Sequence, residues 1–237
     1  MRCWSPRAHL LDTIGGVTEV WWIRHGESDS NAGARTANAA APVLTELGWA
    51  QARAVAGAFD RAPDLIVTSP FVRTKQTAQP LLERFPEVRQ EEWPVQEFTE
   101  LSYANRNNTS GLERLPQLEE YWSRLDPDYL DGEGAETFRD LIGRVEETLK
   151  RMREQQGFTV IFGHGLFMRA MLWWMLAQPE RLDGAAMRRY ALFHDSLWIP
   201  NCAIVRMQLI DGRWFLSPPD VGHLSEVAVT KANESEA

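Results

Sequence analysis

Three short apolar stretches of the sequence each run directly into residues that can bind or transfer an anion. They are Val20–Ser28, which reads Val-Trp-Trp-Ile-Arg-His-Gly-Glu-Ser, residues 65–73, which run through Ser69-Pro70 to Arg73, and residues 160–165, which end in Gly163-His164-Gly165. In open α/β sheets the ligand binds outside the carboxyl ends of the strands, so the ends of three such strands can meet at one rim. The pattern predicts a single electropositive pocket for an anion.

His25 is the candidate nucleophile of this pocket. A neutral imidazole can attack phosphorus and thereby divide one difficult displacement into two easier ones. A lone histidine is more often a core residue with its hydrogen bonds satisfied. Here Arg24 precedes it and Gly26 follows it at a strand end, and this setting favours the catalytic interpretation.

The cations around it suggest phosphoryl chemistry. Arg24 and Arg73 carry forked guanidinium groups that grip phosphoryl oxygens at two points, although surface ion pairing is the alternative for Arg73. His164, between two glycines, is a candidate second imidazole that stabilises the transferring group when protonated, and Gly165 lets the backbone approach a ligand closely. Because phosphoryl transfer depends mainly on positioning and charge stabilisation, we expect neither a metal nor a cofactor.

A proton donor is needed for the leaving oxygen, and a carboxylic acid with a raised pKa usually supplies it. Glu97 and Glu100 compete for this role. Glu27 is expected to order a loop, and Glu136 is expected at a helix start. His9, His194 and His223 are expected to be structural or surface residues. Arg106 and Arg114 are expected to be solvated cations, although they could reach the substrate.

The three blocks, in this order, resemble the histidine phosphatase (phosphoglycerate mutase-like) superfamily. The resemblance covers about Thr18 to Leu224 and rests on Arg24-His25-Gly26-Glu27 with Asn31, on Ser69-Pro70-x-x-Arg73 with Gln76-Thr77-Ala78, and on Gly163-His164-Gly165. It implies that His25 is transiently phosphorylated and that Asn31 and Thr45 lie near the phosphate and substrate. The family's acid follows an apolar strand residue by two positions. Val95-Gln96-Glu97 has this spacing, which favours Glu97.

Composition limits the class of protein. A chain of 237 residues with 44% hydrophobic and 24% charged residues is typical of one soluble globular domain. The net charge of -8 argues against nucleic acid as a partner. Cys3 and Cys202 have neither disulfide-framework nor zinc-ligand spacing, which favours a reducing, cytoplasmic location. The apolar run Leu166–Ala177 is too short to span a bilayer, so no membrane partner is expected.

Hydrophobic periodicity predicts a three-layer α/β/α sandwich with a mostly parallel sheet. We expect an extension at 1–17, one domain at 18–225 with a substrate cap inserted at 98–135, and a disordered tail at 226–237. Strands are expected at 18–23, 62–67, 92–98 and 158–162, with a hairpin at 203–216. Helices are expected from Thr45 to Phe59, from Ser69 and Pro70 to Leu82, and at 115–125, 138–152 and 166–176.

These observations together predict a metal-independent phosphomonoester hydrolase that acts on a small phosphorylated substrate through a phosphohistidine. Two alternatives stay open. A mutase would return the phosphoryl group to its substrate, and a catalytically silent module would only bind a phosphorylated ligand. The sequence leaves the oligomeric state and the identity of the substrate open.

Overall fold

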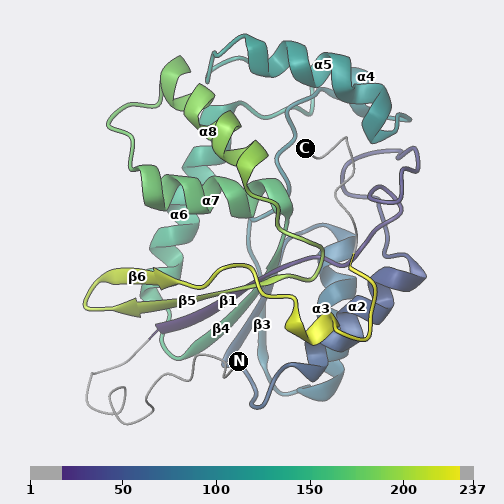
Figure 1. The fold of residues 1–237 in the computed structure, drawn as a ribbon, viewed down its shortest axis with the longest axis vertical. Helices are drawn as coiled ribbons and strands as arrows, with labels where there is room; N and C mark the ends of the chain where they lie inside the picture. Colours follow the sequence, from purple (N-terminus) through teal and green to yellow (C-terminus); the bar gives the residue numbers. More distant parts are fainter. Residues whose placement is uncertain (1–17, 230–237) are drawn as a thin grey trace.

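A computed structural model describes residues 18–229, so the predicted extension and residues 230–237 of the predicted tail lie outside the described part of the chain. Six strands form one mixed sheet in the order β3-β2-β4-β1-β5-β6 (Figure 1). They are β1 (Thr18–Arg24), β2 (Leu65–Thr68), β3 (Arg89–Glu92), β4 (Phe158–Gly163), β5 (Ile204–Ile210) and β6 (Arg213–Leu216). The first four pair in parallel, whereas β5 and β6 are antiparallel.

Helices cover both faces of this sheet, which confirms the predicted three-layer α/β fold. On one face lie α2 (Glu46–Gly57) and α3 (Val72–Arg84), and on the other lie α6 (Phe138–Glu154), α7 (Gly165–Ala177) and α8 (Gly184–Ser196). The short helix α4 (Tyr103–Arg106) and helix α5 (Gly111–Ser123) form one end of the molecule, and the 3₁₀ turn η1 (Gly222–Leu224) packs near α2.

Alternation along β1 divides the core into two apolar clusters. Trp22 faces the cluster of α6, α7 and α8, whereas Ile23 faces the cluster of α2 and α3. Both side chains are fully buried. Burial on both faces is what a central strand of such a sheet requires, and it explains why residues 20–23 are an unbroken apolar run.

Four of the helices, α2, α5, α6 and α8, begin at a residue whose side chain caps the helix. The Thr45 side chain accepts a hydrogen bond from the amide of Gly48, as predicted. Thr137 and Asp140 form a reciprocal capping box at the start of α6, and Ser110 and Glu113 form another at the start of α5.

The register of the parallel strands brings the three predicted blocks together. Arg24 of β1 pairs with Gly163 of β4, and the amide of His25 donates to the carbonyl of Gly163 at 3.0 Å. His25 and His164 therefore emerge side by side. On the other side of β4, the amide of Ser69 donates to the carbonyl of Phe162 at 3.3 Å, so the end of β2 meets the same rim.

Several predicted boundaries were wrong. The second strand spans 65–68 instead of 62–67. The predicted strand at 92–98 is absent from that position, because β3 occupies residues 89–92 and the chain beyond it has no regular structure. The predicted helix at 115–125 spans 111–123, so Gly111 lies inside it. Helix α8 had no counterpart among the predicted elements.

The start of α3 also differs from the prediction. The helix begins at Val72 with Phe71 as its N-cap, although Ser69 and Pro70 had the expected residue types. The hydroxyl of Ser69 accepts a hydrogen bond from the amide of Phe71 at 3.2 Å, but it also bonds Thr74 and His164. Ser69 therefore belongs to the rim of the sheet and not to the helix.

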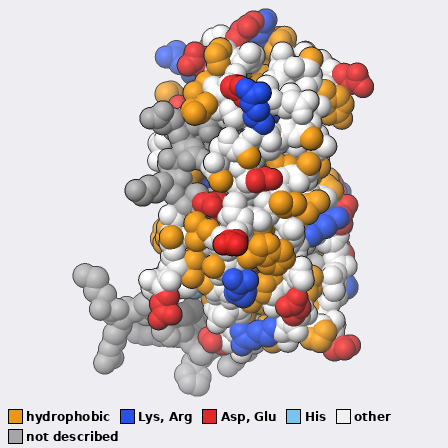
Figure 2. All heavy atoms as spheres, turned by 90° about the vertical axis from the view of Figure 1, so that its right-hand side faces the viewer, with side chains coloured by type: hydrophobic (Ala, Val, Ile, Leu, Met, Phe, Trp, Pro, Cys, Tyr) orange, Lys and Arg blue, Asp and Glu red, His pale blue; other side chains and the backbone are white. Residues whose placement is uncertain are grey.

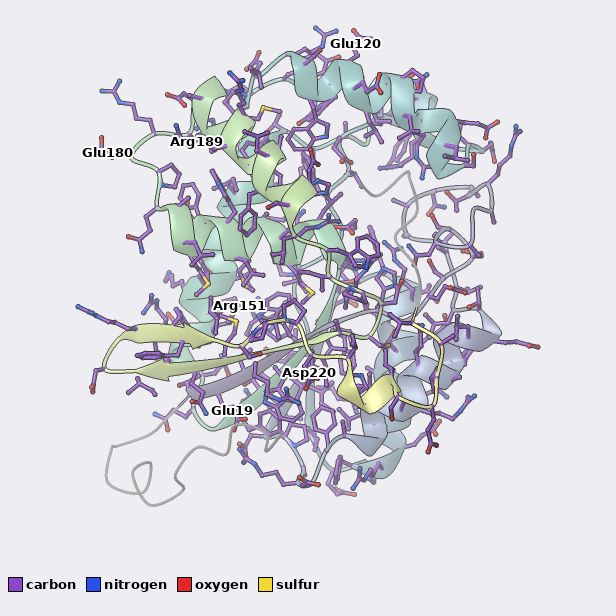
Figure 3. The ribbon with its side chains drawn as sticks, in the orientation of Figure 1. Glu19, Glu120, Arg151, Glu180, Arg189 and Asp220 are labelled. Carbon is purple, nitrogen blue, oxygen red and sulfur yellow. The ribbon has the colours of Figure 1, made fainter. Side chains whose placement is uncertain are left out.

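The surface carries charges of both signs. Figure 2 shows one face on which acidic and basic side chains are interspersed among apolar ones. Figure 3 shows Glu120 on α5 and Arg189 on α8 directed outward near the end of the molecule that α4 and α5 form. Within residues 18–229 the longest apolar helices fall short of what a bilayer span requires.

Candidate active site

His25 is buried, with 3% of its surface exposed, and its hydrogen bonds fix one tautomer. Its Nδ1 lies 2.7 Å from the carbonyl oxygen of Gly26, which can only accept, so Nδ1 carries the proton. Its Nε2 accepts a hydrogen bond from Nε of Arg73 at 3.1 Å. Burial, followed by the charges of Arg73 and Arg24, holds the pKa of His25 well below its usual range. The ring is therefore neutral, with its Nε2 lone pair in the site.

His164 is fully buried next to it, with the two ring centroids 5.1 Å apart. Its Nε2 lies 2.7 Å from the hydroxyl of Ser69, whereas Nδ1 has no hydrogen-bond partner among residues 18–229. Burial and the nearby charge of Arg73 keep the pKa of His164 well below its usual range. Before a ligand binds, this second imidazole is therefore neutral as well. The charged form that the sequence suggested needs the negative charge of a bound phosphate to stabilise it.

Arg24 and Arg73 approach His25 from different elements. Arg24 ends β1, is 2% exposed, and donates from Nη1 to the carbonyl of Ile199 at 2.7 Å. Its guanidinium also lies 5.0 Å from the ring centroid of Trp198. Arg73, in the first turn of α3, is 7% exposed and donates from Nη1 to the carbonyl of Ala39 at 2.8 Å. Two desolvated guanidinium groups beside one neutral imidazole suit a phosphate dianion.

Glu97 lies at the amino end of α7. Its Oε1 accepts a hydrogen bond from the amide of Phe167 at 3.1 Å, and its Oε2 accepts one from the amide of Leu166 at 3.3 Å. These amides belong to the first turn of the helix that begins directly after His164. The carboxyl group is thus held at the same corner as the two histidines.

Glu100 lines the same cavity from the side of α4 and α5. Burial, together with the charge of Glu97, raises the pKa of Glu100 to about 7, although its own backbone hydrogen bond, Arg114 and Arg106 oppose the shift. Burial also lowers the pKa of both arginines. They were predicted as solvated cations, but they line the cavity and Arg106 is only 9% exposed.

The cavity has a volume of about 500 Å³, far more than a phosphoryl group occupies. Its floor contains His25, Arg24 at the end of β1 and Arg73 in the first turn of α3. Its walls come from the loop after β1 and from α5, including Leu115, Leu118 and Trp122. The leaving group of a substrate would therefore contact both apolar and cationic side chains.

Of the other predicted substrate contacts, Asn31 lines the cavity and Thr45 does not. Asn31 Oδ1 accepts hydrogen bonds from the hydroxyl of Ser28 at 3.1 Å and from Asn201 at 3.2 Å. Besides capping α2, Thr45 donates to Oε1 of Glu27 at 2.9 Å, so Glu27 orders a loop as predicted. Gly165 packs closely against Arg24. A Cβ atom added at Gly165 would lie 3.3 Å from Nε of Arg24, so a larger residue there would crowd the guanidinium group.

Several residues of the site were not predicted from the sequence. Arg169 is 4% exposed, lines the cavity and donates to the carbonyl of His194 at 3.2 Å. His194 and Asp195 of α8 line the cavity too. A signal for α8 was present, because Asp183 accepts a hydrogen bond from the amide of Ala186 as a helix N-cap. In the described part of the chain, no cluster of three or more His, Cys, Asp or Glu residues suited to a metal is found.

Comparison with curated protein sequences gives no match. Solved structures with the same fold include an alpha-ribazole phosphatase from Shigella flexneri (18% identity, TM-score 0.67, covering 86% of this chain and 96% of that one). They also include a phosphoserine phosphatase mutant from Entamoeba histolytica, bound to phosphoserine (20% identity, TM-score 0.65, covering 87% of this chain and 98% of that one). A third is a mycobacterial glucosyl-3-phosphoglycerate phosphatase (23% identity, TM-score 0.63, covering 85% of this chain and 98% of that one).

The family profile described as "Histidine phosphatase superfamily (branch 1)" matches residues 20–217, a span that contains all three sequence blocks. The chain belongs to the histidine phosphatase superfamily.

Proposed function

We propose that this phosphatase hydrolyses a small phosphomonoester through a phosphohistidine at His25, without a metal. The observation that carries the proposal is the fixed, neutral tautomer of His25. Because Nδ1–H is committed to the carbonyl of Gly26, only Nε2 has a lone pair to offer. Nε2 is also the atom that lies next to Arg73, so a phosphate bound to this arginine is in reach of the nucleophile.

The reaction then takes two displacements. In the first, a bond forms between Nε2 of His25 and phosphorus while the bond to the leaving oxygen breaks, and that oxygen takes a proton from Glu97. In the second, water attacks phosphorus and gives a proton back to Glu97 while the bond to Nε2 breaks. Arg24, Arg73 and His164 balance the charge on the equatorial oxygens throughout.

The choice of Glu97 over Glu100 rests on position. Glu97 is anchored to the turn that follows His164, whereas the charges that act on Glu100 include Arg106 and Arg114 of the cap. The raised pKa of Glu100 suits an acid, but a proton donor must reach the oxygen attached to phosphorus.

The neighbours with named phosphorylated substrates support a small metabolite as the substrate here. A cytoplasmic location agrees with the spacing of the two cysteines. A catalytically silent module would not need these groups together, so the presence of His25, Arg24, Arg73 and Glu97 in the lining of one cavity supports hydrolysis over mere binding.

A rapid quench with a ³²P-labelled aryl phosphate tests the intermediate. The native enzyme should yield an acid-labile, base-stable phosphoenzyme, and excess chelator should leave its turnover unchanged. His25→Ala should abolish both label and turnover. The matched control is His223→Gln, because His223 is a partly buried histidine that bonds the carbonyl of Cys202 outside the cavity. Label that persists in His25→Ala would refute the proposal.

A further inference from the structure

The segment that carries Glu97 lacks the hydrogen bonds of regular structure. After β3 ends, the amide of Trp93 still donates to the carbonyl of Thr68 at 3.0 Å, but the chain from Trp93 to Glu100 is neither strand nor helix. Trp93 and Val95 are buried at 1% and 0% exposure. Backbone carbonyls in such a buried segment need partners from elsewhere.

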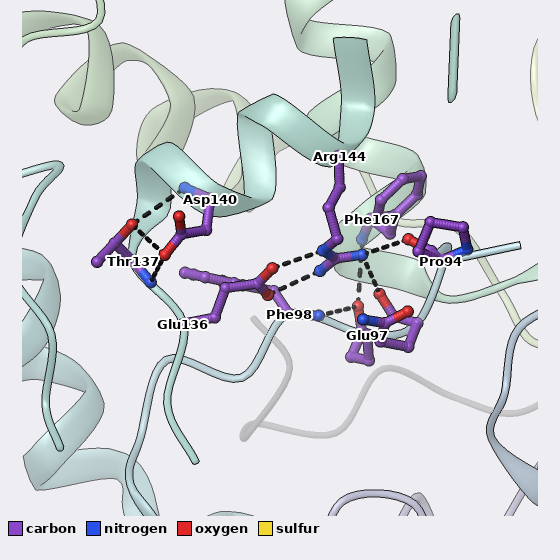
Figure 4. Close-up of polar contacts among 9 residues, drawn as sticks. Pro94, Glu97, Phe98, Glu136, Thr137, Asp140, Arg144 and Phe167 are labelled. Carbon is purple, nitrogen blue, oxygen red and sulfur yellow. Dashed lines mark hydrogen bonds and ion pairs between the residues drawn. The ribbon is translucent and has the colours of Figure 1, made fainter. Parts of the chain in front are cut away.

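Arg144 of α6 supplies them. Its Nη1 donates to the carbonyl of Pro94 at 2.8 Å and to that of Gln96 at 3.1 Å, on either side of Val95 (Figure 4). Its Nε and Nη2 grip the two carboxylate oxygens of Glu136 at 2.5 and 2.7 Å. The two side chains are only 14% and 16% exposed, so this forked pair is well shielded from water.

The guanidinium of Arg144 also contacts Phe167, whose backbone amide holds the carboxylate of Glu97. The Cζ of Arg144 lies 5.0 Å from the ring centroid of Phe167, and the amide of Phe167 donates to Glu97. Figure 4 shows Arg144 between Glu136 on one side and the Glu97 segment on the other. One side chain thus fixes both the chain that leads into Glu97 and the helical residue that holds its carboxylate.

We infer that Arg144, locked by Glu136, is the positioning residue that aims Glu97 at the leaving oxygen. The inference rests on the proposed function, in which Glu97 donates the proton. Arg144 itself does not line the cavity, so it acts through Glu97. Misplacing a catalytic group by about 1 Å can cost on the order of 100-fold in rate.

The test compares an alkyl phosphate, which needs a proton on its leaving oxygen, with an aryl phosphate, which needs it much less. Arg144→Gln should lower kcat/KM about 10- to 100-fold for the alkyl ester and about threefold or less for the aryl ester. Arg144→Lys keeps the positive charge but loses the planar guanidinium, and Glu136→Gln loses the carboxylate that holds Arg144. Both variants should lose less activity than Arg144→Gln, and both should again slow the alkyl ester more than the aryl ester. These two milder variants carry the test if Arg144→Gln does not fold.

The matched control is Arg139→Gln on the same helix. Arg139 also grips a carboxylate at two points, that of Asp128, and also donates to a carbonyl, that of Leu182. It lies away from Glu97, so its loss should leave the ratio of the two rates unchanged. Thermal unfolding of each variant measures the purely structural cost.

A double variant separates the inference from the proposed function. In a Glu97→Gln background, Arg144→Gln should lower the alkyl rate by less than about threefold further, because the group it positions is already disabled. If the losses of rate in the two single variants add in the double variant, or if Arg144→Gln slows both esters equally, the inference about Arg144 is wrong. The proposed function would not be affected by that result. If Glu97→Gln does not slow the alkyl ester more than the aryl ester, the assignment of Glu97 as the proton donor fails instead.

Discussion

Replacing His25 by asparagine should make the stability of the protein less sensitive to acid. In the folded state, burial and the charges of Arg73 and Arg24 hold the pKa of His25 well below its usual range, whereas in the unfolded chain it titrates near 6.5. As the pH falls through 6.5, the unfolded chain takes up a proton that the folded protein refuses. Stability is therefore lost toward acid, and each such histidine adds to the loss.

The size of the effect follows from counting protons. Between about pH 7 and pH 5, a histidine that stays neutral when folded costs up to about 2 kcal/mol of unfolding free energy. His25 and His164 both contribute in this direction. Glu100 opposes them, because its pKa is raised to about 7. As the pH falls, Glu100 takes up its proton at a higher pH in the folded state than in the unfolded chain. This raises the free energy of unfolding by about 2 kcal/mol over the same pH interval.

The net loss from these three groups is therefore about 2 kcal/mol in the native sequence. His25→Asn should reduce it to near zero, and Glu100→Gln should increase it to about 4 kcal/mol. Urea unfolding at several pH values, followed by tryptophan fluorescence, measures these slopes, and titrations common to all variants cancel in the comparison. If His25→Asn keeps the slope of the native protein, His25 takes up its proton over the same pH range in the folded and unfolded states, and the reasoning that burial keeps the folded imidazole neutral is refuted.

Two further predictions concern the reaction. Glu97→Gln should slow an alkyl phosphate on the order of 100-fold and an aryl phosphate much less, while Glu100→Gln should affect both only modestly; the reverse pattern in steady-state kinetics would move the proton donor to Glu100. With 3-phosphoglycerate and its bisphosphate primer, phosphate release should outrun formation of the 2-isomer, because the wide cavity admits water. Faster isomerisation, measured by ³¹P NMR, would make the enzyme a mutase.

The rim of the sheet was predictable from sequence because its geometry follows from strand pairing. Once β1, β2 and β4 are recognised as neighbouring parallel strands, the residues after their carboxyl ends must converge. Arg24, His25 and His164 needed no further information. Ser69 did, because its local context indicated a helix cap, while the partner that defines its role, His164, lies 95 positions away in the sequence.

The segment at 92–98 shows a different limit. Trp93 and Val95 are buried and Pro94 between them is exposed, which is the alternation of a strand. Alternation reports burial and not hydrogen bonding, and here the carbonyls go to the side chain of Arg144 on α6. Glu136 was predicted as a helix-start acid, but it lies one residue before the N-cap Thr137, and Asp140 is the acid of the first turn of α6. The pairing of Glu136 with Arg144 depends on tertiary structure that no local pattern encodes.

The two arginines in the predicted cap, Arg106 and Arg114, show why the substrate was harder to predict than the chemistry. Arg106 and Arg114 follow an irregular segment whose local sequence is that of a solvated surface, and only the packing of α4 and α5 over the cavity draws them out of water. Removing an arginine from water is costly unless an anion compensates it. Glu100 acts on both arginines and Glu113 acts on Arg114, and at neutral pH the pKa of about 7 leaves Glu100 about half protonated. On the side of α4 and α5 the cavity is thus lined by side chains of both signs, Arg106 and Arg114 with Glu100 and Glu119, whereas His25, Arg24 and Arg73 line it at the rim of the sheet. Because different elements supply these two sides, the side that would contact a leaving group can change in sequence while the residues at the rim stay the same.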